Sequence, residues 1–251
     1  VSWFGGARLP EAAEAEATYQ AAVVAEYTTK STLGRGTICA GSCRVTSAVD
    51  AKKYRRSPLI LAAPLIASVS EEVDVADITR GALPTCTITD ENGNPEDHDE
   101  LLHGVLDDAG FMTLRTWSNT SGVYFNNPRT FTDYTSDFSL GPNRRVMDLA
   151  LTTARAYLRK VLSKQLRVNK RTGFIKEPEA VRIEKGLTRA LELELLGKPK
   201  ASGVTVLLSR TDNILSTKTL TVDIQIVPLA YPKTINLTIG FYNPALMLLA
   251  A

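Results

Sequence analysis

Histidine, cysteine and long apolar runs are all scarce in this sequence. Only two histidines and three cysteines occur in 251 residues, so there are few of the side chains that most often bind zinc or act as acid–base catalysts. The longest apolar run, at 58–69, contains Pro64 and is shorter than the roughly 20 residues of a membrane-spanning helix. No secretory signal is visible at the start. These absences argue against a zinc enzyme and against membrane insertion.

An excess of one charge is also lacking over the whole chain. Lysine and arginine total 29 against 27 aspartates and glutamates, a net charge of +2. Any surface for a charged partner must therefore be local. The hydrophobic content of 44% and the charged content of 22% are typical of a folded soluble protein, and the length allows one large domain or two small ones.

Both histidines lie in one acidic stretch, at 96–103. Asp97, His98 and His103 would suit a hydrolase or a metal enzyme if their side chains converged on one point. However, His98 and His103 are five positions apart, which turns them away from each other on a helix. We therefore predict a polar, solvated loop and no catalytic, cofactor-binding or metal-binding residues. Activity lost on His98→Ala would favour the enzyme alternative.

The three cysteines are Cys39, Cys43 and Cys86. They lack the paired spacing of a zinc site. Because three is an odd number, at least one thiol is free or pairs between chains. We therefore treat all three as candidates for a disulfide between subunits.

The first 90 residues predict short helices and strands in succession. A helix is expected from Pro10 to Lys30, where a proline and then glutamates suit the first turns. Strands are expected at 37–40, 45–49 and 85–89, and a buried helix at 58–69. The basic cluster at 52–56 is interpreted as a solvated loop, with an acidic or phosphate-bearing partner as the alternative.

The last third of the chain has the clearest strand pattern. Apolar and polar residues alternate at 220–227 and again at 234–241, and 204–209 is a third strand candidate. Pro228 and Pro232 lie between the two alternating strands, so we predict that these two form an antiparallel hairpin. A second hairpin, 111–117 with 123–125, is expected to join the same sheet.

Two amphipathic helices precede these strands. The first is expected to begin near Ser136 or at Pro142 and to run to about Leu162, and the second to run from about Pro178 to Leu195. Each has one apolar stripe. We therefore predict an α+β fold in which a mixed, largely antiparallel sheet is covered by two antiparallel amphipathic helices.

The stretch from Arg144 to Arg171 holds nine basic residues and a single acidic one, Asp148. Such a concentration indicates a solvated face, an acidic protein surface nearby, or a nucleic acid. A basic nucleic-acid-binding module is therefore the alternative function, and salt-dependent binding to arbitrary DNA would favour it.

Seven short motifs stand out between residues 122 and 246. They are 122–129 (GVYFNNPR), 136–138 (SDF), 143–147 (NRRVM), 172–175 (TGFI), 209–217 (SRTDNILST), 228–232 (PLAYP) and 240–246 (GFYNPAL). In order and spacing these motifs resemble contractile-tail sheath proteins of phages, most clearly their C-terminal domain, and the resemblance covers about residues 90 to 246.

The resemblance implies a structural, non-enzymatic subunit. Such proteins stack as hexameric rings in a helical assembly around an inner tail tube, between baseplate and terminator proteins, and contract to drive the tube through a host envelope. It implies a protein of the virion, assembled in the host cytoplasm, with no direct nucleic-acid contact. The basic residues expected to face the tube are Arg155, Arg159, Lys160 and Lys164.

The resemblance also implies extended terminal arms that add strands to the sheets of neighbouring subunits. The residues expected in this role are Thr234, Ile235, Leu237, Ile239, Phe241, Leu246 and Leu248. It further implies an N-terminal α/β portion at 1–89 and a C-terminal sheath domain at 90–251. Because the chain opens on Val1 and sheath proteins are commonly longer, a preceding portion is expected.

Overall fold

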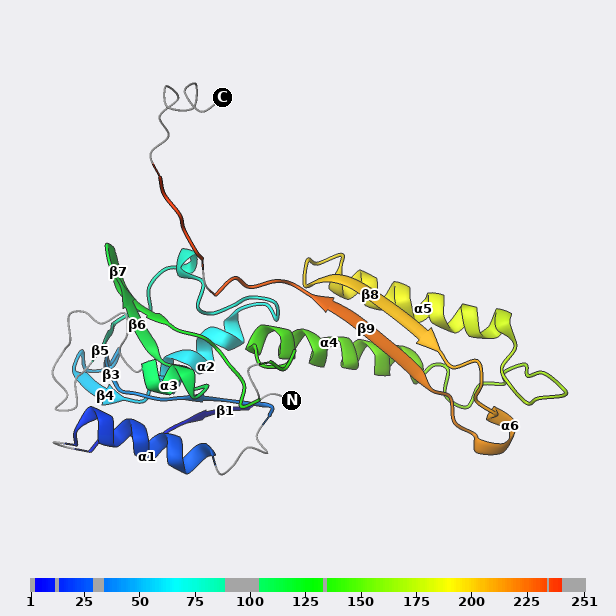
Figure 1. Ribbon diagram of the computed structural model, residues 1–251, viewed down its shortest axis with the longest axis horizontal. Helices are drawn as coiled ribbons and strands as arrows, with labels where there is room; N and C mark the ends of the chain where they lie inside the picture. The colour runs from blue at the N-terminus through cyan, green and yellow to red at the C-terminus, as the bar shows by residue number, and fades with distance from the viewer. Residues whose placement is uncertain are drawn as a thin grey trace, which may run out of the picture.

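The computed structural model describes residues 3–11, 14–28, 34–88, 104–132, 135–233 and 235–240. Its helices and strands form two groups at opposite ends of an elongated molecule (Figure 1). One group comes from residues 3–132 and the other from residues 141–228. Helices and small, mostly antiparallel sheets occur together, which is an α+β fold, as predicted.

The first group contains small sheets with helices around them. Its helices are α1 (Glu16–Thr28), α2 (Leu59–Ser68), the 3-10 turn η1 (Ile78–Arg80) and α3 (Gly104–Asp108). Its strands are β1 (Trp3–Gly6), β2 (Gly36–Cys39), β3 (Cys43–Thr46), β4 (Lys53–Arg56), β5 (Cys86–Ile88), β6 (Leu114–Trp117) and β7 (Thr120–Phe125). β1 pairs with β2 in parallel, β3 lies between β4 and β5, and β6 pairs with β7.

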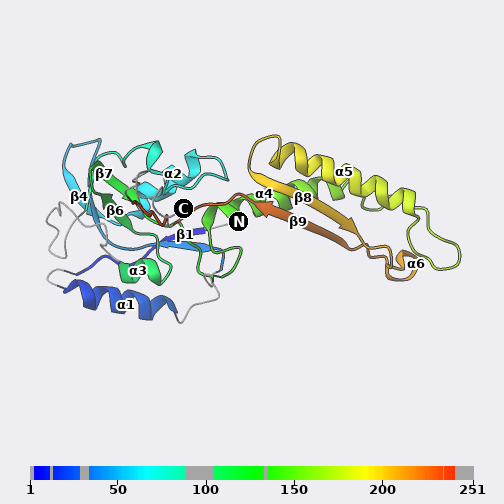
Figure 2. The same cartoon turned by 45° about the horizontal axis from the view of Figure 1, so that its top comes forward.

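The second group is built on two long helices. α4 (Gly141–Leu158) and α5 (Glu177–Leu195) run in opposite directions. They are followed by β8 (Ala201–Leu208), the single turn α6 (Ile214–Thr217) and β9 (Val222–Pro228). β8 and β9 form an antiparallel two-stranded sheet. In Figure 2 this sheet crosses in front of α4, and α5 lies alongside β8.

A leucine stripe on α5 anchors the packing of this second group. Leu187, Leu191 and Leu195 are fully buried against Val146 and Ala150 of α4. The spacing of four residues keeps the leucines on one helix face. Burying each leucine side chain contributes roughly 1.5–3 kcal/mol relative to exposing it. The stripe therefore holds α4, α5 and the β8–β9 sheet together.

The sheet differs from the one that the sequence predicts. The described residues form four small sheets, and β6–β7 is separate from β8–β9. β9 pairs with β8 instead. Val206 lies opposite Ile224 and Leu208 opposite Val222, on the face of the sheet that packs on the helices. The expected hairpin of 220–227 with 234–241 is therefore wrong within the described residues. No strand is assigned at 235–240.

The first long helix is also shorter than predicted. α4 begins at Gly141, with Pro142 in its first turn, and ends at Leu158 instead of Leu162. Turns follow it, and Ser163 has a φ of 61°, which a helix cannot contain. The second helix runs from Glu177 to Leu195, close to the predicted bounds.

The core separates into clusters that follow the two groups. The apolar clusters of the first group include Phe125, Phe111 and Ile38, whereas those of the second include Leu187 and Ile183. The predicted boundary between domains, at 89/90, lies at the edge of residues 89–103, which fall outside the described part. That boundary stays a prediction.

Candidate functional site

The segment after β9 leaves the second group and runs across to the first (Figure 1). Pro228 ends β9, and the Tyr231 hydroxyl donates a hydrogen bond of 2.6 Å to the Glu72 carbonyl oxygen. Lys233 pairs with Asp74. The chain is therefore held against the loop after α2 just before residues 235–240 begin.

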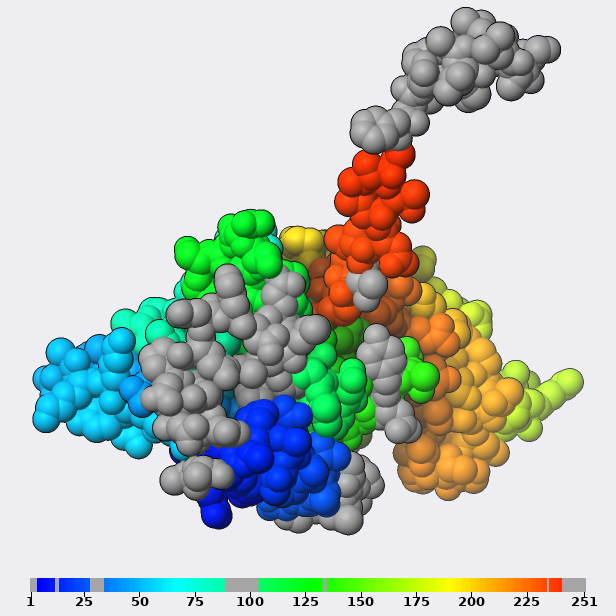
Figure 3. Space-filling view, turned by 60° about the vertical axis from the view of Figure 1, so that its left-hand side comes forward, coloured from blue at the N-terminus to red at the C-terminus, as the bar shows by residue number. Residues whose placement is uncertain are grey.

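Residues 235–240, which we call the arm segment, project from the body of the molecule (Figure 3). The side chains of Ile235, Leu237 and Ile239 are 82%, 77% and 82% exposed. They alternate with Asn236 and Thr238, the pattern of a strand with one apolar face. Exposed apolar side chains in a row are a candidate interaction surface. Thr234, Phe241, Leu246 and Leu248 lie outside the described residues.

A second exposed feature is the basic end of the second group. Arg155 lies in the last turn of α4. Arg159 and Lys160 follow in the turns after the helix, and Lys164 comes after those turns, so these three are not on the helix as predicted. All four are exposed. The cations lie beside the carboxyl end of α4, where the helix dipole favours positive charge. The structure thus gathers these four side chains near one end of the molecule.

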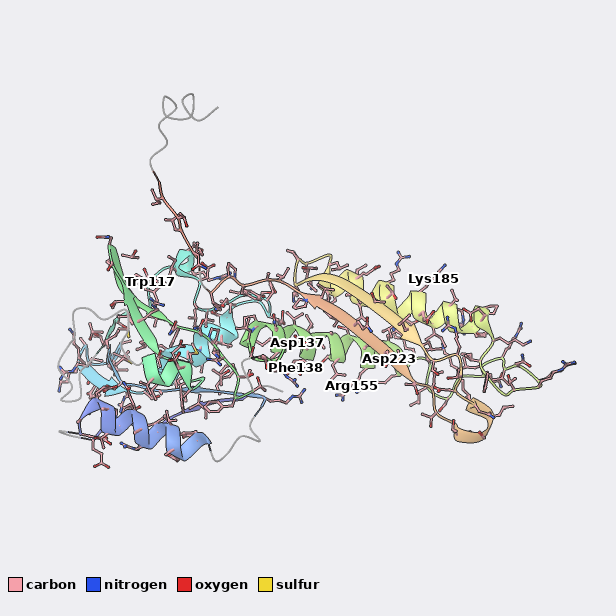
Figure 4. The ribbon with its side chains drawn as sticks, in the orientation of Figure 1. Trp117, Asp137, Phe138, Arg155, Lys185 and Asp223 are labelled. Carbon is pink, nitrogen blue, oxygen red and sulfur yellow. The ribbon has the colours of Figure 1, made fainter. Side chains whose placement is uncertain are left out.

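The carboxylates of Glu177 and Glu184 on α5 are paired with Arg210 and not with the basic end. Arg210 bonds the carboxylates of Glu177 and Glu184 at 2.8–2.9 Å, which holds the pKa of both carboxyl groups below their usual range. No ion pair joins the basic side chains of 155–171 to an acidic residue within 135–233. In Figure 4, Arg155 and Lys185 lie on opposite sides of the helix pair.

The two arginines at the other end of the basic stretch have structural partners. Arg144 is 3.6 Å from Asp148. Arg145 donates hydrogen bonds of 3.1 and 2.8 Å to the carbonyl oxygens of Ile66 and Val69, at the end of α2. Burial lowers the pKa of both guanidinium groups. Of the nine basic residues, Arg144 and Arg145 are therefore half-buried and bonded, and the other seven are exposed. The sequence alone could not show this division.

The basic cluster at 52–56 forms an edge strand rather than the predicted loop. Residues 53–56 are β4, at the edge of the three-stranded sheet, and Arg44 lies directly opposite Arg55. Tyr54 bonds the Asp50 carboxylate, and the Arg56 guanidinium lies 5.3 Å from the centre of the Tyr54 ring. The cluster is thus a folded surface on β4.

The cysteines are all free thiols. Cys39 and Cys43 are fully buried, and Cys86 is half-buried on β5, the strand paired with that of Cys43. Burial raises the pKa of Cys39 to about 12. A disulfide between subunits stays a prediction, and the two buried sulfurs have no exposed surface in the monomer.

No metal-binding cluster is present in the described part of the chain. Asp97, His98 and His103 lie outside it. Residues 3–88 and 104–240, with their gaps, contain no group of three or more histidine, cysteine or acidic side chains placed to hold a metal ion. A cavity of about 1080 Å³ lies between the Glu72–Asp77 loop and the β6–β7 hairpin. Arg115 stacks there on Trp117, with its guanidinium carbon 3.6 Å from the ring centre; Trp117 is labelled in Figure 4.

None of the helices in the described ranges combines the length and apolar character that a membrane span requires.

Sequence reasoning missed the contacts of Tyr231 and Lys233 with the loop after α2. Those partners are 159 positions apart, so no local pattern could reveal them.

Comparison with known proteins gives matches by structure only. No protein-family model and no curated protein matches the sequence. A chain of the sheath complex of an extracellular contractile injection system, PVC, in its contracted state matches with a TM-score of 0.65, at 12% identity. The match covers 95% of this chain and 63% of that one.

Two further matches are chains of the anti-feeding prophage (AFP) baseplate. The 6-fold symmetrised baseplate matches at 11% identity, covering 91% of this chain and 65% of that one, with a TM-score of 0.57. The contracted baseplate matches at 12% identity, covering 95% and 60%, with a TM-score of 0.62. This chain thus spans less than two thirds of the length of all three. The predicted resemblance to contractile tail sheath proteins is confirmed at the level of the fold.

Proposed function

We propose that this chain is a structural subunit of a contractile sheath and joins its neighbours through the arm segment. The observation that carries this proposal is the row of Ile235, Leu237 and Ile239, exposed along an extended segment of a sheath-like fold. Burying three such side chains in a neighbour contributes roughly 5–9 kcal/mol before ordering is subtracted. The subunit is then non-catalytic, and its links build hexameric rings in a helical stack.

The sheet β8–β9 supplies a receptor for such an arm. It has two strands among the described residues, so each strand has one edge without a strand partner there. Unpaired N–H and C=O groups along an edge accept an added strand, and alternate side chains then fix its register. If the arm segment of one copy adds to the β8–β9 sheet of the next, its apolar row is buried and an unpaired strand edge gains a partner.

The arm is tested by replacing its apolar side chains. In the triple variant Ile235→Asn, Leu237→Asn and Ile239→Asn we expect loss of polymer with unchanged circular dichroism, measured by sedimentation velocity and negative-stain electron microscopy. The matched control, Asn236→Ser with Thr238→Ser, changes the other face of the same segment and is expected to assemble normally. Normal polymers from the triple variant would refute the role of the arm.

The basic end is proposed to face an acidic inner tube. Arg155, Arg159, Lys160 and Lys164 are exposed cations, and opposite charges across such an interface mainly raise the association rate and fix orientation. The tube, a baseplate and a terminator would then be the partners of a particle that assembles in the host cytoplasm and functions in the virion. Contraction would drive the tube through the host envelope.

The basic end is tested by reversing charge at two positions. We expect Arg155→Glu with Arg159→Glu to slow assembly on the tube, most strongly at low salt. Lys185→Glu is the matched control, because Lys185 is exposed on the opposite side of the helix pair. Equal effects of both variants would contradict a tube-facing role. Salt-dependent binding of the wild type to arbitrary DNA would support a nucleic-acid-binding module instead.

A further inference from the structure

The loop Glu71–Asp74, between α2 and η1, contacts the second group and the segment that follows it. Its carboxylates pair with Lys200 and Lys233, and its Glu72 carbonyl accepts from Tyr231. Just before the loop, the Ile66 and Val69 carbonyls accept from Arg145. The partners are 76 to 159 positions away in the chain. The loop is therefore a junction between the two groups of elements.

Two partners of the loop, Tyr231 and Lys233, lie directly before the arm segment. Tyr231 and Lys233 follow β9, and Ile235 is the first described residue beyond them. The Asp74 side chain is only 11% exposed, so its pairing with Lys233 is partly shielded from water. Burial and the nearby acidic groups raise the pKa of Tyr231 to about 12, which keeps its hydroxyl protonated as a donor.

We propose that the loop Glu71–Asp74 is a clasp that fixes the direction in which the arm segment leaves the subunit. The inference rests on the proposed function, since the direction matters only if the arm reaches a neighbour. Two contacts to consecutive parts of the chain, a hydrogen bond at Tyr231 and an ion pair at Lys233, restrict both position and orientation. The arm is thereby presented before a neighbour arrives, which lowers the ordering entropy of binding.

The effect of the clasp on the arm follows from the length of free chain. With the clasp closed, Asn236 is three residues beyond the last fixed point, Lys233. With the clasp open, the last fixed point is Pro228, eight residues away. For a flexible chain these lengths give end-to-end spreads of about 10 Å and about 16 Å.

Spin labels measure this spread directly. One label is placed at Asn236→Cys and one at Val49→Cys, an exposed turn of the first group. The Cys86→Ser background is used because Cys39 and Cys43 are buried. Pulsed electron paramagnetic resonance on dilute monomer then gives the distance distribution between the labels.

The clasp is opened by Asp74→Asn with Tyr231→Phe, which removes the ion pair and the hydrogen bond at nearly constant size. We expect the distance distribution to become broader by a factor of about 1.6, because the r.m.s. end-to-end distance of the free chain rises from about 10 Å to about 16 Å. Asp77→Asn is the matched control, because Asp77 lies in the same region but its side chain bonds Thr79 and Arg80 and neither Tyr231 nor Lys233. Exchanging the two charges, by Asp74→Lys with Lys233→Asp in a chain that keeps Tyr231, is expected to give a distribution as narrow as that of the wild type.

Unchanged spread in the double variant, or equal broadening in the control, would overturn the clasp. Assembly is measured in parallel by sedimentation. Broadening together with slower assembly supports both the clasp and the role of the arm. Broadening with unchanged assembly supports the clasp as a holder of the chain and overturns its role in assembly, whereas the role of the arm itself is overturned only by normal polymers from the triple variant at Ile235, Leu237 and Ile239.

Discussion

Gly141, the first residue of α4, starts this helix against the end of the first group. A Cβ added at Gly141 would lie 2.7 Å from the Pro128 carbonyl oxygen. The Gly141 amide donates a hydrogen bond to the same oxygen, also at 2.7 Å. The neighbour is backbone, so rotation of a side chain cannot relieve the contact. Gly141→Ala therefore tests how tightly the two groups are joined.

Two effects of this substitution oppose each other. Helix propensity favours alanine over glycine by about 1 kcal/mol. Overpacking against a fixed neighbour costs about 1–3 kcal/mol. The packing effect is the larger, so we expect the free energy of unfolding to fall by about 1 kcal/mol, which lowers Tm by about 2–4 °C in a protein of this size.

The assay is urea unfolding followed by circular dichroism, with Gly104→Ala as the control. Gly104 is also the first residue of a helix, α3, but no described atom lies within 4 Å of its added Cβ. That variant is expected to be as stable as the wild type or up to about 1 kcal/mol more stable. If Gly141→Ala matched the control or exceeded the wild type, the packing argument would be refuted.

Three further outcomes follow from the core, the ion pairs and the thiols. Leu191→Ala, at a fully buried position, is expected to lower the free energy of unfolding by about 2–5 kcal/mol in the same urea assay. The bond from Arg210 lowers the pKa of Glu184 below its ordinary 4.5, so the stabilisation is present above that pH and is lost on acidification. Glu184→Gln should therefore lose less stability than the wild type between about pH 5 and pH 3. In the native protein a thiol reagent should leave Cys39 unmodified, because it is buried with a pKa of about 12, and only urea should make it react.

The long helices could be predicted because their signals are local. Pro178 and the leucines of α5 specify its start and its buried face, and Gly197 specifies its stop. The end of α4 could not be predicted, because Leu158 is followed by neither glycine nor proline. Arg159 and the cations after it were consequently assigned to a helix that had already ended.

Strand partners could not be predicted from alternation. A period of two shows which face of β9 is buried, but it does not show which strand lies beside it. The register of Val206 with Ile224 is set by packing on α4 and α5. The apolar face of the arm segment was visible in the sequence for the same local reason. Its attachment through Tyr231 was not, since the contact joins distant parts of the chain.

The contacts between the loop Glu71–Asp74 and residues 200–233 also bear on the order of folding. They join residues 71–74 to residues 200–233, which come 129 to 159 positions later in the chain. Contacts of such long sequence separation form late, because much chain must be ordered first. During synthesis the first group can fold before Tyr231 and Lys233 emerge. The contacts that hold the chain just before the arm segment therefore close only after the loop Glu71–Asp74 and residues 200–233 have both been made.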